Sequence, residues 1–265
     1  MRLYDSHNHL QDERLAPHLA EVLASAQREG VARMVVNGSC EADWPLVLEL
    51  ARQHPIVLPS FGYHPWYINE RTPEWQTKLV SFLDTVPSAV GEIGLDRWIK
   101  DYDLPDQEEV FLFQLRLATE RNLPVSIHCL EAWGRMHELL RVNPRPSRGF
   151  LLHSYGGPVE MVMPLAKLGA YFSFPGYFAH ERKERQRAAF RAVPLDRLLI
   201  ETDAPDQLPP DSCRPYPLTD VTGKPLNHPA NLRTIYEFVA TMFNEPTEIL
   251  ALRVEANFQR LFGKL

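Results

Sequence analysis

Cysteine is scarce in this chain of 265 residues, and its three cysteines, Cys40, Cys129 and Cys213, form no paired motif. No apolar run reaches the roughly 18 residues that a transmembrane helix needs. The first residues also lack the basic region and apolar stretch of a signal peptide. An odd number of cysteines without a secretion signal predicts reduced thiols. We therefore expect a cytoplasmic protein that does not contact a membrane.

An excess of positive charge is also lacking, because the formal net charge is −6. This balance argues against a broad surface that binds nucleic acid without specificity. It does not exclude a nucleic-acid substrate, since carboxylates in a site count as negative and bound divalent ions reverse that charge locally.

What the sequence does contain is an alternation of short apolar runs with longer segments of helical spacing. The helical segments include one from Leu15 to Ala26 and three later ones, at Val110–Arg121, Ala230–Phe243 and Glu248–Phe262. The short runs predict eight strands, at Arg2–His7, Ala32–Asn37, Ile56–Gly62, Ala89–Ile93, Val125–His128, Gly149–His153, Ala170–Phe174 and Leu198–Thr202.

Eight strands that alternate with helices predict an α/β protein of one domain over residues 1–265, a (β/α)8 TIM barrel. The sheet is expected to be parallel, because parallel neighbours need crossover connections. A doubly wound open sheet would show the same local pattern. The barrel is favoured because the chemically active residues fall at the carboxyl ends of strands. The proline-rich segment Leu208–Pro229 is expected to form a long irregular loop.

Five of the eight predicted strands end in residues that can bind a metal ion. In the sequence Asp5-Ser6-His7-Asn8-His9, both histidines point the same way if the strand is extended. Each residue taken alone has an ordinary structural alternative, such as a helix cap or a buried partner of arginine. Together they predict a metal site made of His7, His9, Glu92, His128, His153 and Asp203.

Imidazoles and carboxylates are ligands that Zn²⁺, Mn²⁺ and similar ions accept. Six residues are too many for one open catalytic ion, and they fit two ions that share a carboxylate. We expect Glu92 to be the bridge, with His7, His9 and Asp203 on one ion and His128 and His153 on the other. Such a site generates hydroxide from bound water near neutral pH, and Asp203 is also a candidate proton acceptor.

Several motifs resemble those of the TatD family of metal-dependent hydrolases, within the amidohydrolase superfamily. The motifs run along most of the chain: DSHNHL at 5–10, FGYHP at 61–65, GEIGLD at 91–96, QEEVFLFQLRLATERNLPVSIHC at 107–129, HSYGG at 153–157, ETDAP at 201–205, Asn257, and Leu261-Phe262. The combination of GEIGLD, the glutamine-containing helix and the strand that carries His128 is the most specific part.

The resemblance implies a TIM barrel, a site for two divalent ions (Zn²⁺, Mn²⁺ or Mg²⁺) and hydrolysis of phosphodiesters, with deoxyribonuclease activity. The expected partner is nucleic acid or a small phosphodiester as substrate, and no obligate protein partner is evident. The resemblance also places His64 beside the site, near a substrate phosphate. The alternative for His64 is a structural role ahead of Pro65.

The chain departs from the family pattern at positions that we expect to lie beside the ligands and to touch substrate. Leu130 stands where many relatives carry arginine, and Asn227-His228-Pro229 replaces a common Asn-Glu-Pro. The segments HSYGG and SFPG also differ from the commoner forms. The metal chemistry is therefore better supported than the nuclease activity.

Aromatic residues in predicted loops or helix starts on the ligand side could stack bases or pack the loops: Trp66, Tyr67, Trp98 and Trp133. The acidic stretch Asp101–Glu109 would repel phosphates if it faced the site.

Three other functions remain open. A deaminase or cyclic-amide hydrolase of the wider superfamily is one, although many two-metal members use a carboxylated lysine where this chain has Glu92. A phosphoesterase of the polymerase-and-histidinol-phosphatase type also begins with two such histidines, but GEIGLD is not its signature. The third is a catalytically silent barrel that binds nucleic acid or a protein partner.

Overall fold

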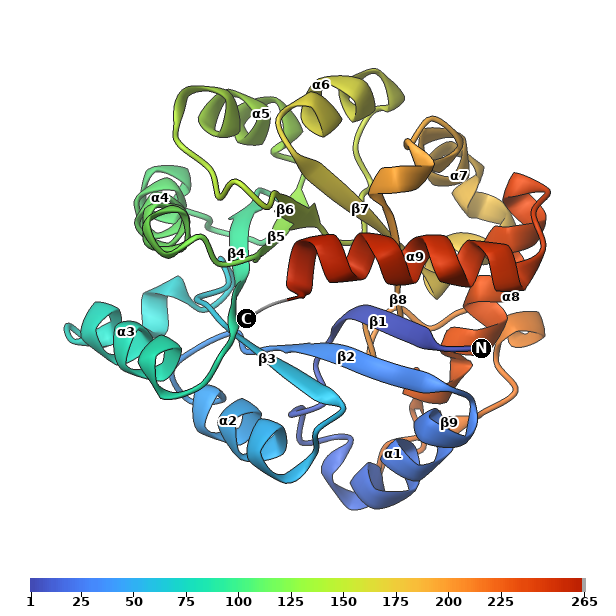
Figure 1. Ribbon diagram of the computed structural model, residues 1–265. Coiled ribbons are helices and arrows are strands. Elements are labelled where there is room, and N and C mark those ends of the chain that lie inside the picture. Colours follow the sequence, from blue (N-terminus) through green and yellow to red (C-terminus); the bar gives the residue numbers. More distant parts are fainter. Residues whose placement is uncertain (264–265) are drawn as a thin grey trace.

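A computed structural model describes residues 1–263 (Figure 1). Its main sheet has eight parallel strands in the order of the sequence, from β1 to β8. Their bounds are β1 Leu3–Asn8, β2 Val31–Asn37, β3 Val57–Phe61, β4 Ala89–Asp96, β5 Val125–Leu130, β6 Phe150–Leu152, β7 Ala170–Pro175 and β8 Leu198–Glu201.

The two ends of the sheet meet, so that the strands form a nearly closed barrel rather than an open sheet. The Ser6 hydroxyl of β1 donates to the Ile200 carbonyl of β8 at 2.9 Å. Just beyond β8, the backbone N–H of Asp203 donates to the His7 carbonyl at 3.0 Å. These contacts confirm the predicted barrel.

Helices surround the barrel between the strands (Figure 1). They are α1 Leu19–Arg28, α2 Trp44–Gln53, α3 Trp75–Thr85, α4 Leu104–Arg121, α5 Trp133–Val142, α6 Val162–Lys167, α7 Glu184–Arg191, α8 Leu232–Phe243 and α9 Thr247–Phe262. The predicted start of α4 at Val110 is six residues late. The amphipathic pattern begins at Val110, whereas the helix is started by Asp103, whose carboxylate accepts the backbone N–H of Asp106.

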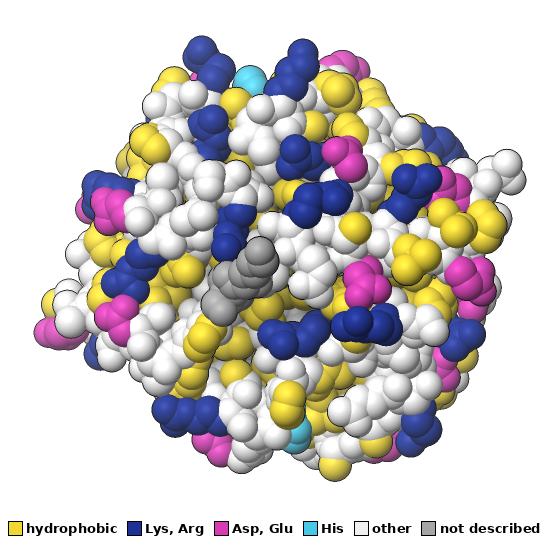
Figure 2. Space-filling model, in the orientation of Figure 1, with side chains coloured by type: hydrophobic (Ala, Val, Ile, Leu, Met, Phe, Trp, Pro, Cys, Tyr) yellow, Lys and Arg dark blue, Asp and Glu magenta, His cyan; other side chains and the backbone are white. Residues whose placement is uncertain are grey.

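Helix α9 crosses the end of the barrel where the strands begin. Its Asn257 side chain donates to the carbonyls of Leu195 and Leu198, at the start of β8, at 2.8 and 2.7 Å. On this face, Figure 2 shows basic side chains spread out with acidic ones among them. The carboxyl ends of the strands lie at the opposite end of the barrel, where sites of this fold are built.

Several predicted strand bounds match the observed ones, and the others differ by one to three residues. Strand β4 continues to Asp96, while His153 and Thr202 lie just beyond β6 and β8. The proline-rich segment 208–229 is not wholly irregular, because Leu218–Thr219 (β9) pairs antiparallel with Pro225–Leu226 (β10). Within residues 1–263, no helix is long and apolar enough to cross a membrane.

Candidate metal centre

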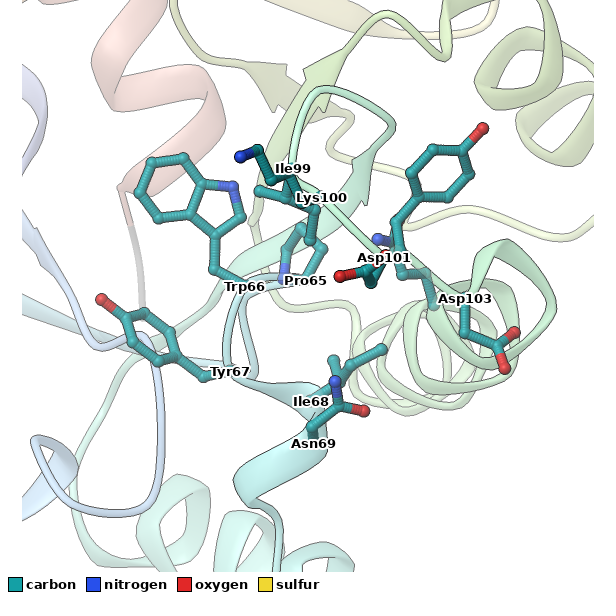
Figure 3. Close-up of a pocket in the computed structure, with 11 residues that line it drawn as sticks. Pro65, Trp66, Tyr67, Ile68, Asn69, Ile99, Lys100, Asp101 and Asp103 are labelled. Atoms are coloured by element: carbon teal, nitrogen blue, oxygen red, sulfur yellow. The ribbon is translucent and has the colours of Figure 1, made fainter.

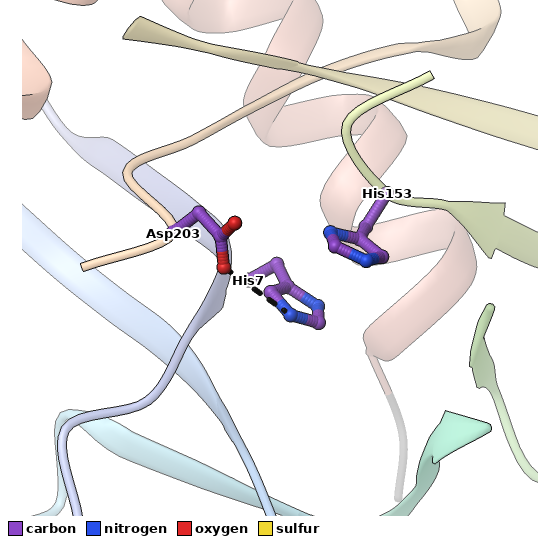
Figure 4. Close-up of side chains that lie close together, drawn as sticks. All are labelled: His7, His153 and Asp203. Atoms are coloured by element: carbon purple, nitrogen blue, oxygen red, sulfur yellow. Dashed lines mark ion pairs between the residues drawn. The ribbon is translucent and has the colours of Figure 1, made fainter. Parts of the chain in front are cut away.

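The six predicted ligands come together at the carboxyl end of the barrel. They lie within or just beyond β1, β4, β5, β6 and β8, as the alternating pattern predicts. Figure 4 shows three of them, His7, His153 and Asp203, and the rings of the two histidines stack with centroids 3.9 Å apart. Side chains from strands far apart in the sequence therefore converge on one small volume.

One group of donor atoms surrounds Oε2 of Glu92. Nε2 of His7 and Nε2 of His9 each lie 3.3 Å from this oxygen, and they are 3.3 Å from each other. Oδ1 of Asp203 is 3.6 Å from both nitrogens. Four ligands placed tetrahedrally around a zinc ion are about 3.3 Å apart, so these donors have the spacing of one ion site.

A second group surrounds the other oxygen of Glu92. Nδ1 of His128 lies 3.1 Å and Nε2 of His153 lies 2.7 Å from Oε1, and the two nitrogens are 3.3 Å apart. Three protein donors leave room for a water or substrate oxygen, as catalytic sites require. Burial would raise the pKa of Glu92, but the surrounding imidazoles hold this pKa well below its ordinary value.

A histidine that binds a metal through one ring nitrogen usually carries its proton on the other, and acceptors within hydrogen-bond distance of two of these rings favour that form. Nδ1 of His9 faces the Asn37 carbonyl at 2.9 Å, and Nε2 of His128 faces Asp96 Oδ2 at 2.9 Å. For His153, Oε1 of the buried Glu201 lies 3.7 Å from Nδ1, which has no hydrogen-bond partner among residues 1–263. Nδ1 of His7 lies 2.8 Å from the hydroxyl of Ser126, which can also accept.

His64 has the opposite arrangement. Its Nδ1 accepts the backbone N–H of Trp66 at 3.1 Å, so the proton of the neutral ring is on Nε2. Nε2 lies 3.3 Å from Oε1 of Glu92. Burial lowers the pKa of His64 to about 4, so the ring is neutral at pH 7. His64 is close enough to be counted among the possible ligands, but it presents an N–H donor to the site instead of a lone pair.

The close approach of β4 and β5 depends on Gly94. It is paired with His128 in the parallel ladder. A Cβ atom at position 94 would lie 1.9 Å from the carbonyl oxygen of His128. Only glycine therefore lets the strand that carries Glu92 lie this close to the strand that carries His128.

Comparisons with known proteins agree with this geometry. The model of the family "TatD related DNase" matches residues 4–263. The chain belongs to the TatD-related DNase family.

Relatives of known name cover nearly the whole chain. The chain is 31% identical over 265 residues to an uncharacterized metal-dependent hydrolase, YabD, of Bacillus subtilis, covering 98% of each protein. It is 31% identical over 268 residues to the 3′-5′ ssDNA/RNA exonuclease TatD of Escherichia coli K12, covering 98% of this chain and 99% of that protein.

Among solved structures, YJJV, a TatD homolog from Escherichia coli K12, superposes with a TM-score of 0.88 at 26% identity, covering 100% of this chain and 99% of that one. These comparisons confirm the TatD resemblance and the barrel fold, and the metal-dependent relatives fit a site for divalent ions.

One departure from the TatD pattern does not lie where we expected. The ring of His228 is 2% exposed, its Nε2 lies 3.2 Å from Oε2 of Glu21 on α1, and its Nδ1 accepts the N–H of Ala230. The expectation that His228 touches substrate is therefore wrong, because the residue caps the turn before α8. Leu130, at the end of β5, is 36% exposed.

Sequence reasoning missed the residues that support the ligands. Asp96 stands in the GEIGLD motif and was given no role, although it contacts His128. Two buried glutamines of α4 hold backbone at and beyond strand ends: Gln107 bonds both the N–H and the carbonyl of Asp96, each at 2.8 Å, and Gln114 does the same for Tyr63. The sequence signal that could have revealed the two glutamines is their spacing of seven residues, which puts both on one helical face whose other residues are mostly apolar.

The contact between Asp96 and His128 predicts a loss of metal affinity in Asp96→Asn. Burial raises the pKa of Asp96, but the opposing effect of His128 and Trp66 is larger and brings the pKa to about 2. The carboxylate is therefore charged at pH 7. An amide accepts more weakly and can present an N–H to Nε2, which would favour the wrong ring form. We expect metal to bind about 10- to 100-fold more weakly, measured by chelator competition. Asp101→Asn, an exposed change in the following loop, should keep wild-type affinity.

Proposed function

We propose that this chain binds two divalent ions and hydrolyses phosphodiester bonds at the ends of single-stranded nucleic acid. The observation that carries the proposal is the placement of Glu92, whose two oxygens face two separate donor groups. A shared carboxylate is the arrangement expected of a two-ion hydrolytic centre. The names of the TatD relatives supply the substrate class.

The ions, when bound, supply positive charge beside the phosphate and lower the pKa of water. His7, His9 and Asp203 would hold one ion, His128 and His153 the other, and Glu92 both. The intact set of donors and their spacing argue against a silent barrel. Family membership favours phosphodiester hydrolysis over deamination.

We assign Asp203 as the group that would accept a proton from the attacking water. Its Oδ1 faces His7 and His9, while its Oδ2 accepts from the side chain of Gln207 at 2.8 Å. Burial raises the pKa of the Asp203 carboxyl above its ordinary value. Because Asp203 would also be a metal ligand, one residue would serve as both ligand and proton acceptor.

His64 is the residue we assign to substrate. Its Nε2–H points at the ligand cluster, and a neutral donor there can bind a non-bridging oxygen of the phosphate and stabilise its growing negative charge.

The proposal is tested by metal analysis of the purified protein together with a substrate screen. We expect two equivalents of divalent metal per chain, and cleavage of single-stranded DNA or RNA that a chelator abolishes and added Mn²⁺, Mg²⁺ or Zn²⁺ restores. Duplex DNA, a small aryl phosphodiester and a cyclic amide are the comparison substrates. Metal-loaded protein that cleaves no phosphodiester would contradict the proposal, and cleavage of the cyclic amide alone would move the chain to the other branch of the superfamily.

A further inference from the structure

A pocket of about 320 Å³ adjoins the candidate metal centre through Trp66, which lines it and whose ring contacts those of His64 and His128. It is formed by the loop after β3 and the loop after β4, with Gln107 of α4 also in its lining. Figure 3 shows Trp66 and Tyr67 on one side of this pocket and Asp101 and Asp103 on the other. Its volume suits one small flat group rather than a folded partner.

Trp66 connects the pocket to the ligands. Its indole Nε1–H donates to Oδ2 of Asp96 at 2.7 Å, the same oxygen that faces His128. The ring lies edge-on to His64, with centroids 5.3 Å apart, and 6.5 Å from the ring of His128. Trp66 is therefore fixed in position directly beside the centre.

Despite these contacts, Trp66 remains 47% exposed. A large ring that is held rigidly at a site and left open to solvent has little conformational entropy to lose when a flat ligand stacks on it. Trp98 on the neighbouring loop is 63% exposed, but within the described chain its indole has no hydrogen bond or ring contact. Trp98 reaches Asp96 only through its backbone N–H, so the two tryptophans differ in that only the indole of Trp66 contacts the residues of the centre.

The charges of the lining residues indicate which part of a nucleotide the pocket can bind. Lys100 is offset by Asp101 and Asp103 in the lining, so the pocket does not attract a phosphate. Aromatic faces bind bases of any sequence, and each stacked base contributes substantially to binding of single strands. The phosphate would instead lie over the ligand cluster, beside His64.

We propose that Trp66 stacks on the nucleobase next to the phosphate at the metal centre, and that this contact selects unpaired ends. The inference rests on the proposed function and adds the residue that recognises the base. A paired base is stacked within its duplex and cannot lie on Trp66 until it is released. The pocket therefore restricts the enzyme to single strands without reading their sequence.

The test compares Trp66→Ala with Trp98→Ala on short oligonucleotides that carry either a normal residue or an abasic residue at the 3′ end or next to it. In the wild type, loss of the base should lower kcat/KM by about 10- to 100-fold. Trp66→Ala should lose a similar factor on the normal oligonucleotide and should no longer distinguish it from the abasic one. Trp98→Ala should keep the wild-type discrimination.

Two further measurements separate stacking from damage to the centre. Trp66→Phe keeps a ring but loses the bond to Asp96, so it should retain most of the discrimination, and metal content is measured for every variant. Titration with uncleavable phosphorothioate DNA should quench tryptophan fluorescence in the wild type and much less in Trp66→Phe.

The inference would be overturned if Trp66→Ala still preferred the normal oligonucleotide to the abasic one. It would also be overturned if Trp98→Ala lost this preference to the same extent. If the wild type cleaves no oligonucleotide, the proposed function fails, and the fluorescence titration still decides whether Trp66 binds bases.

Discussion

Glu92→Gln should lower hydrolysis by about 1000-fold or more, because it removes the one negative charge that both groups of donors share. Four imidazole nitrogens lie within 3.3 Å of the two oxygens of Glu92 in these groups. An amide offers one oxygen and places an N–H against the other group, so neither ion would be held well. The measurements are kcat/KM for a single-stranded oligonucleotide and metal content after dialysis.

A readout that does not depend on turnover is the shift of the melting temperature when metal is added. An ion that binds only the folded chain raises the melting temperature. We expect a clear rise for the wild type and almost none for Glu92→Gln. Glu70→Gln, at an exposed glutamate in the short helix Ile68–Glu70, is the matched control and should behave as wild type. If Glu92→Gln bound two equivalents of metal with wild-type affinity, Glu92 would not be the bridge.

The convergence of the six candidate ligands could be predicted from the sequence because they fall at the ends of five apolar strands, with His7 and His9 sharing one. In a parallel barrel all strands end at one edge, so the positions of His128 and Asp203 in the sequence were enough to place them together. The bounds of the strands were off by up to three residues, but convergence depends only on which end of a strand a residue occupies.

The support for the ligands could not be predicted in this way. Asp96 contacts His128 because Gly94 pairs with His128, and this register depends on an approach that only the folded backbone reveals. His228 shows the opposite error. Its neighbours in the sequence suggested a place at the site, whereas its ring is buried against Glu21 of α1, more than 200 residues away in the chain. Side-chain contacts between residues far apart in the chain leave no periodic pattern in the sequence from which they could be predicted.

The protonation of His64 leads to the second large effect. Because Nδ1 accepts the N–H of Trp66, Nε2–H is available as a donor, and loss of such a donor or acid lowers turnover by about 100-fold or more. We expect His64→Ala to lower kcat by this factor while metal content and the metal-induced rise in melting temperature stay at wild-type levels.

His64→Gln separates the two ways in which the ring could act. The glutamine amide can place an N–H near the position of Nε2, but it cannot give up a proton at neutral pH. Recovery of most of kcat in His64→Gln would mean that the ring stabilises phosphate charge by a hydrogen bond, whereas a loss equal to that of His64→Ala would mean proton transfer. Loss of one metal equivalent in both variants would instead make His64 a ligand, and the assignment of its proton to Nε2 would be wrong.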